Sequence, residues 1–171
     1  MSAAPIQNLR LALYQPDIPQ NAGTMLRACA CLGVSAAIIE PAGFPVSDRH
    51  FRRSGMDYLD SLRIDRHVDF AAFEAWRLDA QARLGGHRLV LLTTKAAVDY
   101  AGFAFAPDDI ILTGRESAGV PDAVHAAADA RLVIPMMPAM RSLNVAVAAA
   151  MVLGEALRQL RGSPQGDQPG K

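Results

Sequence analysis

An arginine stands within a helical segment near the N-terminus, one turn after a glycine. Residues 21–32 place apolar side chains at helical spacing, and Arg27 lies off that apolar stripe. Because helical side chains lean toward the N-terminus of their helix, Arg27 projects over Gly23, which leaves that surface open. A guanidinium held in this way can bind a phosphate or a carboxylate. The alternative interpretation is a solvated arginine on an exposed face of the helix.

Three further polar loops follow segments that are typical of buried strands. They are Thr93-Thr94-Lys95, TGRESAGVP at residues 113–121, and PMMPAMRSLN at residues 135–144. Gly114 allows the backbone to approach a ligand closely, and Ser142 or Asn144 can cap the helix that follows. Taken alone, each loop can have a purely structural explanation, as a turn, as a helix cap or as a place for a charged side chain at the rim of the sheet. Together with the segment before Arg27, they make four such loops at one edge of a sheet, and this position indicates a binding site.

Hydrophobic patterning predicts the elements that position these loops. Short apolar runs predict strands at 9–14, 36–40, 88–93, 109–113 and 130–135. Helical spacing predicts helices at 21–32, 69–82, 118–127 and 143–160. Strands alternating with helices favour an α/β fold, with a mostly parallel sheet and helices on both faces. We expect one domain over residues 1–161, a disordered polar tail at 162–171, and Asn21 as the N-cap of the first helix.

Composition and missing motifs narrow the function. Lys plus Arg equals Asp plus Glu at 17 each, so net charge alone indicates no nucleic-acid partner, although a local basic patch is compatible with one. The sequence has no GxGxxG, no GxxxxGK(S/T) and no GxSxG motif, and its four histidines are scattered, so no metal site is expected. Cys29 and Cys31 point to different faces of a helix, so they can form neither a disulfide with each other nor a zinc site. With no signal peptide and no apolar run that could span a bilayer, these cysteines favour a cytoplasmic protein without a membrane partner.

Three segments together resemble the motifs of a known enzyme family. They are NAGTMLR (21–27), LTGRESAGVP (112–121) and IPMMPAMRSLNVAVAAAMVLGEA (134–156). Their order and spacing resemble the SpoU branch of the SPOUT RNA methyltransferases. The further segments IPQNAGTMLR, IIEPAGF, DRHFRRSGMDY and LLTTK resemble the small single-domain members that methylate the 2′-hydroxyl of the tRNA wobble nucleotide.

The resemblance implies an α/β fold with a deep C-terminal trefoil knot, a homodimer, and S-adenosylmethionine as the cofactor bound in the knot. Its implied substrate is the ribose of nucleotide 34, a cytidine or uridine, in the anticodon stem-loop of tRNA. By match to the family motifs, the residues around the cofactor are Leu92, Thr93, Gly114, Glu116, Ile134, Ser142, Leu143 and Asn144.

Arg27 matches the arginine of the first family motif. A ribose hydroxyl is a weak nucleophile that must be positioned and deprotonated. Because an arginine is nearly always protonated, its safer role is to hold a phosphate of the substrate and stabilise developing negative charge. In the family this arginine is also proposed to take the proton. Asn21 can orient the ribose or simply cap the helix.

Basic residues that can contact RNA phosphates are expected near the site. They are Arg49, Arg52, Arg53, Lys95 and Arg141. Without the resemblance, a solvated basic face is the preferred interpretation.

The last predicted helix is apolar almost all round and rich in alanine, which favours a dimer interface over a central helix of a monomer. Two positions depart from many relatives: Ala146 replaces a polar residue, and Gly154 replaces a tyrosine. A glycine within a helix indicates close packing. The alternatives are methylation of another tRNA or rRNA position, a knotted RNA-binding protein without catalysis, and a binder of small nucleotides.

Overall fold

The structure is a computed structural model that describes residues 9–46 and 61–161. The expected tail at 162–171 therefore lies outside the described residues. The elements in chain order are β1 (Arg10–Tyr14), α1 (Pro19–Leu32), β2 (Ser35–Ile39), β3 (Ile64–His67), α3 (Phe70–Leu84), β4 (Leu89–Leu92), β5 (Val98–Asp99), the short 3-10 helix η2 (Tyr100–Gly102), β6 (Ile110–Thr113), α4 (Asp122–Ala127), β7 (Ala130–Val133) and α5 (Val145–Leu160).

Seven strands form one parallel sheet in the order β3-β2-β1-β6-β4-β7-β5. Apart from Arg10 and Thr113, the central strands β1, β6 and β4 carry apolar or aromatic side chains, as a sheet covered on both faces requires. All five predicted strands are confirmed within two residues of their expected ends. β3 and β5 were not predicted, because β3 reads IDRH and β5 has only two exposed residues. Both lie at the edges of the sheet, where apolar patterning is weakest.

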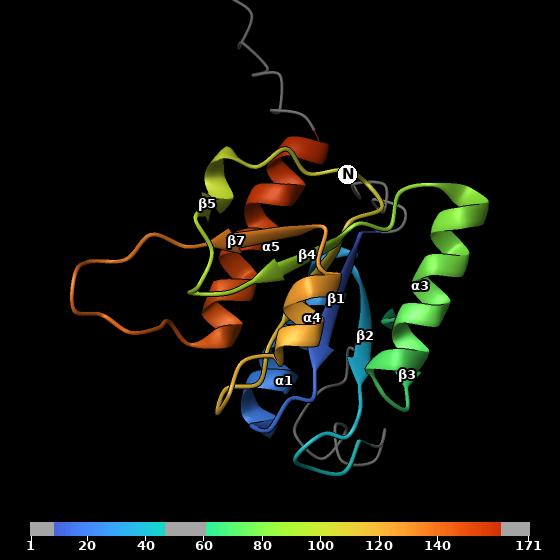
Figure 1. Cartoon of the computed structure of the whole chain (residues 1–171). Helices are drawn as coiled ribbons and strands as arrows, with labels where there is room; N and C mark the ends of the chain where they lie inside the picture. Colours follow the sequence, from blue (N-terminus) through green and yellow to red (C-terminus); the bar gives the residue numbers. More distant parts are fainter. Residues whose placement is uncertain (1–8, 47–60, 162–171) are drawn as a thin grey trace, which may run out of the picture.

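Alternate residues of each strand pack against different helices. Leu11 and Leu13 of β1 belong to the cluster that α1 and α5 complete, whereas Ala12 and Tyr14 belong to the cluster that includes Phe73 of α3 and residues near α4. In Figure 1, α5 lies at the end of the sheet that carries β7, and α3 lies at the end that carries β2 and β3. The predicted α/β architecture with helices on both faces is confirmed. The trefoil knot stays a prediction.

The first helix begins earlier than expected. α1 starts at Pro19 with Ile18 at the N-cap, so the expectation that Asn21 caps the helix is wrong. The physical reason is Pro19, whose fixed φ and missing N–H suit the first helical position and move the helix start upstream. Gly33 ends the helix in the left-handed conformation, with φ 71°. Asn21 therefore sits inside the first turn, and its side chain is available for other contacts.

Two further boundaries differ from the expected ones. The predicted helix 118–127 begins only at Asp122, because residues 115–119 form a tight antiparallel bridge that ends at Gly119 with φ 63°. α5 begins at Val145, and Asn144 is its N-cap: the Asn144 Oδ1 accepts hydrogen bonds from the N–H groups of Ala146 and Val147. Of the two predicted caps, Asn144 is thus the one used.

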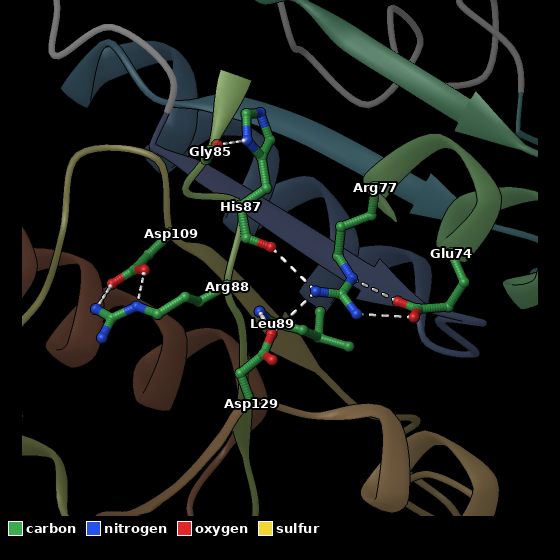
Figure 2. A network of polar contacts seen from close by, with 8 residues as sticks. All are labelled: Glu74, Arg77, Gly85, His87, Arg88, Leu89, Asp109 and Asp129. Atoms are coloured by element: carbon green, nitrogen blue, oxygen red, sulfur yellow. Dashed lines mark hydrogen bonds and ion pairs between the residues drawn. The ribbon is translucent and has the colours of Figure 1, made fainter. Parts of the chain in front are cut away.

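A polar network fixes the amino ends of the central strands (Figure 2). Arg77 of α3 is 3% exposed, and it donates to both Glu74 carboxylate oxygens, to the His87 carbonyl and to Asp129. Asp129 also accepts from the N–H of Leu89, the first residue of β4. Buried charges of this kind are tolerated only when they are fully paired. The network therefore holds α3 to β4 and β7 at the edge of the sheet opposite to the predicted loops.

Within the described ranges, no helix is long and apolar enough to cross a membrane.

Candidate functional site

A cavity of about 560 Å³ lies at the carboxyl ends of the strands. Four connections form its walls: the start of α1, the loop after β4, the loop between β6 and α4, and the loop between β7 and α5. The last of these is orange in Figure 1 and extends away from the body of the molecule. Ligands of open parallel sheets bind at this edge, beyond the carboxyl ends of the strands. The structure thus brings the four predicted loops together.

The cavity contains every residue that the family motifs place around the cofactor. Its lining includes Leu92, Thr93, Gly114, Glu116, Ile134, Ser142, Leu143 and Asn144, and also Asn21 and Lys95. These residues come from positions as far apart as 21 and 144, and only the folded sheet makes them neighbours. Their roles in binding remain predictions.

The backbone at Gly114 lies very close to the backbone at Gly119 in the cavity wall. Arg115 and Gly119 exchange two backbone hydrogen bonds of 3.0 and 2.9 Å, which fold the loop after β6 back on itself. A Cβ on Gly114 would lie 2.9 Å from both the Cα and the carbonyl carbon of Gly119. The backbone at positions 114 and 119 cannot move apart unless the two hydrogen bonds between Arg115 and Gly119 break, so only glycine fits at position 114.

A chain of side-chain hydrogen bonds joins three of the loops. The Asn144 Nδ2 donates to the Asn21 Oδ1 at 3.0 Å, and the Asn21 Nδ2 donates to the Glu116 Oε1 at 3.2 Å. The other carboxylate oxygen of Glu116 accepts from the N–H of Asp17 at 3.1 Å, and the N–H of Glu116 donates to Asp17 Oδ1 at 3.1 Å. Asn21 therefore does not cap its helix; it connects the β6–α4 loop with the start of α5.

Two carboxyl groups in this chain titrate away from their ordinary values. Burial, followed by the contact with the Asp17 side chain, raises the pKa of Glu116. The side-chain contact with Glu116 and the hydrogen bond from the Ser117 hydroxyl hold the pKa of Asp17 well below its usual range, against the opposing effect of its burial. Asp17 is therefore the firmly ionised member of the pair, and Glu116 is the one that takes up a proton more readily.

Arg27 and Arg141 do not line the cavity. Arg27 lies on an exposed face of α1, the same helix whose first turn brings Asn21 to the cavity. Arg141 is exposed in the β7–α5 loop, next to Ser142 of the cavity wall. Lys95 is exposed at the rim and belongs to the lining. The predicted RNA-binding residues Arg49, Arg52 and Arg53 lie outside the described residues.

Sequence reasoning missed Asp17 and Arg115. Asp17 lies three residues after the end of β1, and Arg115 lies two residues after the end of β6 in the loop that also carries Glu116. Both therefore stand at the carboxyl ends of strands, where ligands of parallel sheets bind. The Arg115 Nε lies 3.5 Å from Asp17 Oδ2, and Arg115 lines the cavity. Their position in loops that follow strands could have identified both residues, although the family motifs give neither of them a role.

The cavity suits a cofactor such as S-adenosylmethionine. Its volume falls within the range of about 300–1,000 Å³ that is usual for small-molecule sites. Its walls combine apolar side chains such as Leu92 and Ile134 with amide, hydroxyl and carboxylate groups. The close approach expected at Gly114 is made by the backbone of Gly119. Among residues 9–46 and 61–161, no group of three or more His, Cys, Asp or Glu side chains could hold a metal ion.

Known proteins resemble the chain over almost its whole length. A tRNA (cytidine(34)-2′-O)-methyltransferase of Beijerinckia indica is 74% identical over 150 residues, which cover 88% of this chain and 91% of the relative. A solved structure that concerns the 2-OH methylation of C/U34 on tRNA superimposes with a TM-score of 0.80 at 39% identity, and the match covers 91% of this chain and 97% of that one.

A further neighbour contains the cofactor. The SpoU methyltransferase AviRb from Streptomyces viridochromogenes, in complex with AdoMet, has a TM-score of 0.81 at 29% identity, over 89% of this chain and 60% of that one. The model of the SpoU rRNA Methylase family matches residues 8–154. Sequence, fold and cavity agree, and the chain belongs to the SpoU methylase family.

Proposed function

We propose that the protein transfers a methyl group from S-adenosylmethionine to the ribose 2′-hydroxyl of nucleotide 34 in tRNA. The observation that carries this proposal is the 74% identity, over 88% of the chain, with a tRNA (cytidine(34)-2′-O)-methyltransferase. The neighbour that concerns C/U34 methylation supports the same substrate. The cavity at the carboxyl edge of the sheet supplies the place for the cofactor.

The residues divide into those that hold the cofactor and those that act on the ribose. We assign cofactor binding to the eight lining residues that match the family motifs, from Leu92 to Asn144. When bound, S-adenosylmethionine supplies a methyl group that is already activated by its sulfonium. The protein must therefore position the 2′-hydroxyl and stabilise the oxyanion as its proton leaves. Arg27 fits this task through its permanent charge, and Asn21 connects its helix to the cofactor loops.

RNA contacts are assigned to basic residues around the cavity mouth. Lys95 lies at the rim and Arg141 lies in the extended β7–α5 loop, so both can reach phosphates of a bound anticodon stem-loop. Arg49, Arg52 and Arg53 complete the set by their basic character in the sequence.

The proposed activity is tested by labelling. The purified protein is incubated with tritiated-methyl S-adenosylmethionine and unfractionated tRNA, and the labelled nucleotide is mapped after digestion. We expect label in 2′-O-methylated cytidine or uridine at position 34. Label at another tRNA position or in rRNA would reject nucleotide 34 as the substrate, while methyl transfer to RNA would still be supported. Absence of label, with cofactor binding intact by calorimetry, would reject catalysis in favour of a binding protein.

We also propose a homodimer formed through α5 and the loop that precedes it. Large apolar side chains are exposed here, notably Val147 at 50% and Met151 at 38% on α5, and Met137 at 75% and Met140 at 64% on the loop. A Cβ on Gly154 would meet nothing within 4 Å among the described residues. The close packing that Gly154 suggested is therefore absent from the described part of the chain, and a partner subunit can supply it. An apolar surface of this kind is typical of an interface.

Val147→Arg is expected to break the dimer, because burying an arginine in an apolar interface without an opposite charge to pair with it costs free energy. Size-exclusion chromatography with light scattering should show a change from twice 18.2 kDa to 18.2 kDa. Leu78→Arg is the matched control, since Leu78 is also 50% exposed but lies on α3. A wild-type mass of 18.2 kDa, or a Val147→Arg protein that stays dimeric, would contradict the assigned interface.

A further inference from the structure

We propose that Asp17, in the connection between β1 and α1, is a positioning residue of the methyl-transfer site: its carboxylate holds residues 115–117 in the conformation that forms the cofactor cavity. The expected effect of Asp17 on methyl transfer rests on the proposed function. Its expected effect on cofactor binding rests on geometry alone. None of the family motifs described above assigns a role to Asp17, which precedes the first of them by four residues.

The Asp17 carboxylate contacts three consecutive residues of the β6–α4 loop. Its Oδ1 accepts from the N–H of Glu116 at 3.1 Å, and its Oδ2 accepts from the Ser117 hydroxyl and lies 3.5 Å from the Arg115 Nε. The N–H of Asp17 in turn donates to Glu116 Oε2 at 3.1 Å. The two segments, 99 residues apart in sequence, are thus joined by contacts in both directions.

These contacts determine where the Glu116 side chain lies. One Glu116 oxygen is held by the N–H of Asp17, which leaves the other to accept from Asn21, and Asn21 accepts from Asn144 at the start of α5. The hydrogen-bond chain that spans the cavity therefore begins at Asp17. Fixing a loop in its bound conformation before the ligand arrives reduces the cost of binding.

The backbone around Asp17 is itself held in place. The N–H of Gly43 donates to the Pro16 carbonyl at 2.8 Å, and a Cβ at position 43 would lie 2.9 Å from the Asp17 Cα. The segment after β2 thus packs directly against the backbone of Asp17. A residue whose own backbone is held in place is suited to fix the position of the loop that it binds.

Substituting Asp17 with asparagine separates the role of its charge from its shape. An asparagine keeps the size of the side chain and can still accept one hydrogen bond. It replaces the second acceptor by an N–H₂ donor, which faces the Ser117 hydroxyl that donates to Asp17 and the positively charged Arg115, whose Nε lies 3.5 Å from Asp17 Oδ2. The loop loses charge-assisted bonds, which are roughly twice as strong as neutral ones.

We expect Asp17→Asn to weaken binding of S-adenosylhomocysteine by about 10- to 100-fold, the range for hydrogen bonds to a charged group. The binding is measured by calorimetry on the full chain without RNA, so this result stands whichever RNA is the substrate. In steady state, the KM for S-adenosylmethionine should rise more than kcat falls. Asp17→Glu restores the charge and both acceptors and should recover part of the affinity.

Asp79→Asn is the matched control, because Asp79 pairs only with exposed Arg83 on α3 among the described contacts. Its affinity and KM should equal those of the wild type. The proposal is overturned if Asp17→Asn binds S-adenosylhomocysteine within twofold of the wild type. It is also overturned if Asp17→Asn only lowers the melting temperature while its folded fraction keeps wild-type KM and affinity. Failure of the wild type to label nucleotide 34 would instead reject the proposed function.

Discussion

Arg27→Ala is expected to lower kcat for methyl transfer by about 100- to 1,000-fold, the loss that follows removal of one group that stabilises developing oxyanion charge. Arg27 does not line the cofactor cavity, so the affinity for S-adenosylhomocysteine should stay unchanged. Its side chain is exposed on α1, whose buried residues are Ala22, Met25, Leu26 and Cys29, so the fold should be kept. Single-turnover methylation of tRNA and calorimetry with S-adenosylhomocysteine measure the two effects separately.

Arg83→Ala is the control for the loss of one positive charge. Arg83 is an exposed arginine in the last turn of α3, where it pairs with Asp79. Its removal should leave both kcat and cofactor affinity unchanged. Arg27→Lys keeps the charge but not the planar guanidinium, and it should recover only part of the rate. Turnover of Arg27→Ala at the wild-type rate would reject the catalytic role of this arginine.

Gly114→Ala is expected to reduce cofactor affinity by about 10- to 100-fold, which corresponds to the usual cost of overpacking a close contact. The added Cβ would lie 2.9 Å from backbone atoms of Gly119, so the bridge between Arg115 and Gly119 must open. The loop that carries Glu116 then moves, and the cavity loses one wall. Calorimetric titration with S-adenosylhomocysteine measures this loss directly.

Gly102→Ala makes the same chemical change at an uncrowded position. A Cβ on Gly102, in η2, would meet nothing within 4 Å. This variant should bind the cofactor as the wild type does. If Gly114→Ala bound equally well, the close backbone approach would have no part in forming the cavity.

Local patterning predicted most of the sheet, and its failures have a common physical cause. Runs such as SAAII in β2 are buried on both faces, so nearly every residue must be apolar. The missed strand β3 instead carries Asp65, which pairs with Arg10 of β1, and Arg66, which pairs with Glu40 directly after β2. An edge strand can satisfy such charges, and its sequence therefore resembles a polar loop.

The sequence predicted where the candidate site lies but not which hydrogen bonds its residues form with one another. Placement after a strand indicated the loops, the family motifs marked Gly114, Glu116 and Asn144 within them, and all three line the cavity. The cap at Asn21 was wrong because Pro19 provides a stronger helix start two residues earlier. The bond between Asn21 and Glu116 joins residues 95 positions apart, and no local pattern encodes a contact at that separation.

The hydrogen bond between Asn144 and Asn21 spans 123 residues of sequence, which has a consequence for biosynthesis. A nascent chain cannot assemble the cavity until α5 has left the ribosome and docked beside α1. Contacts of such high sequence separation form late and slow the folding of parallel sheets. A cofactor that binds in the cavity can bind only after this last step. By mass action, its presence in the cell therefore stabilises fully folded chains and not partly folded ones.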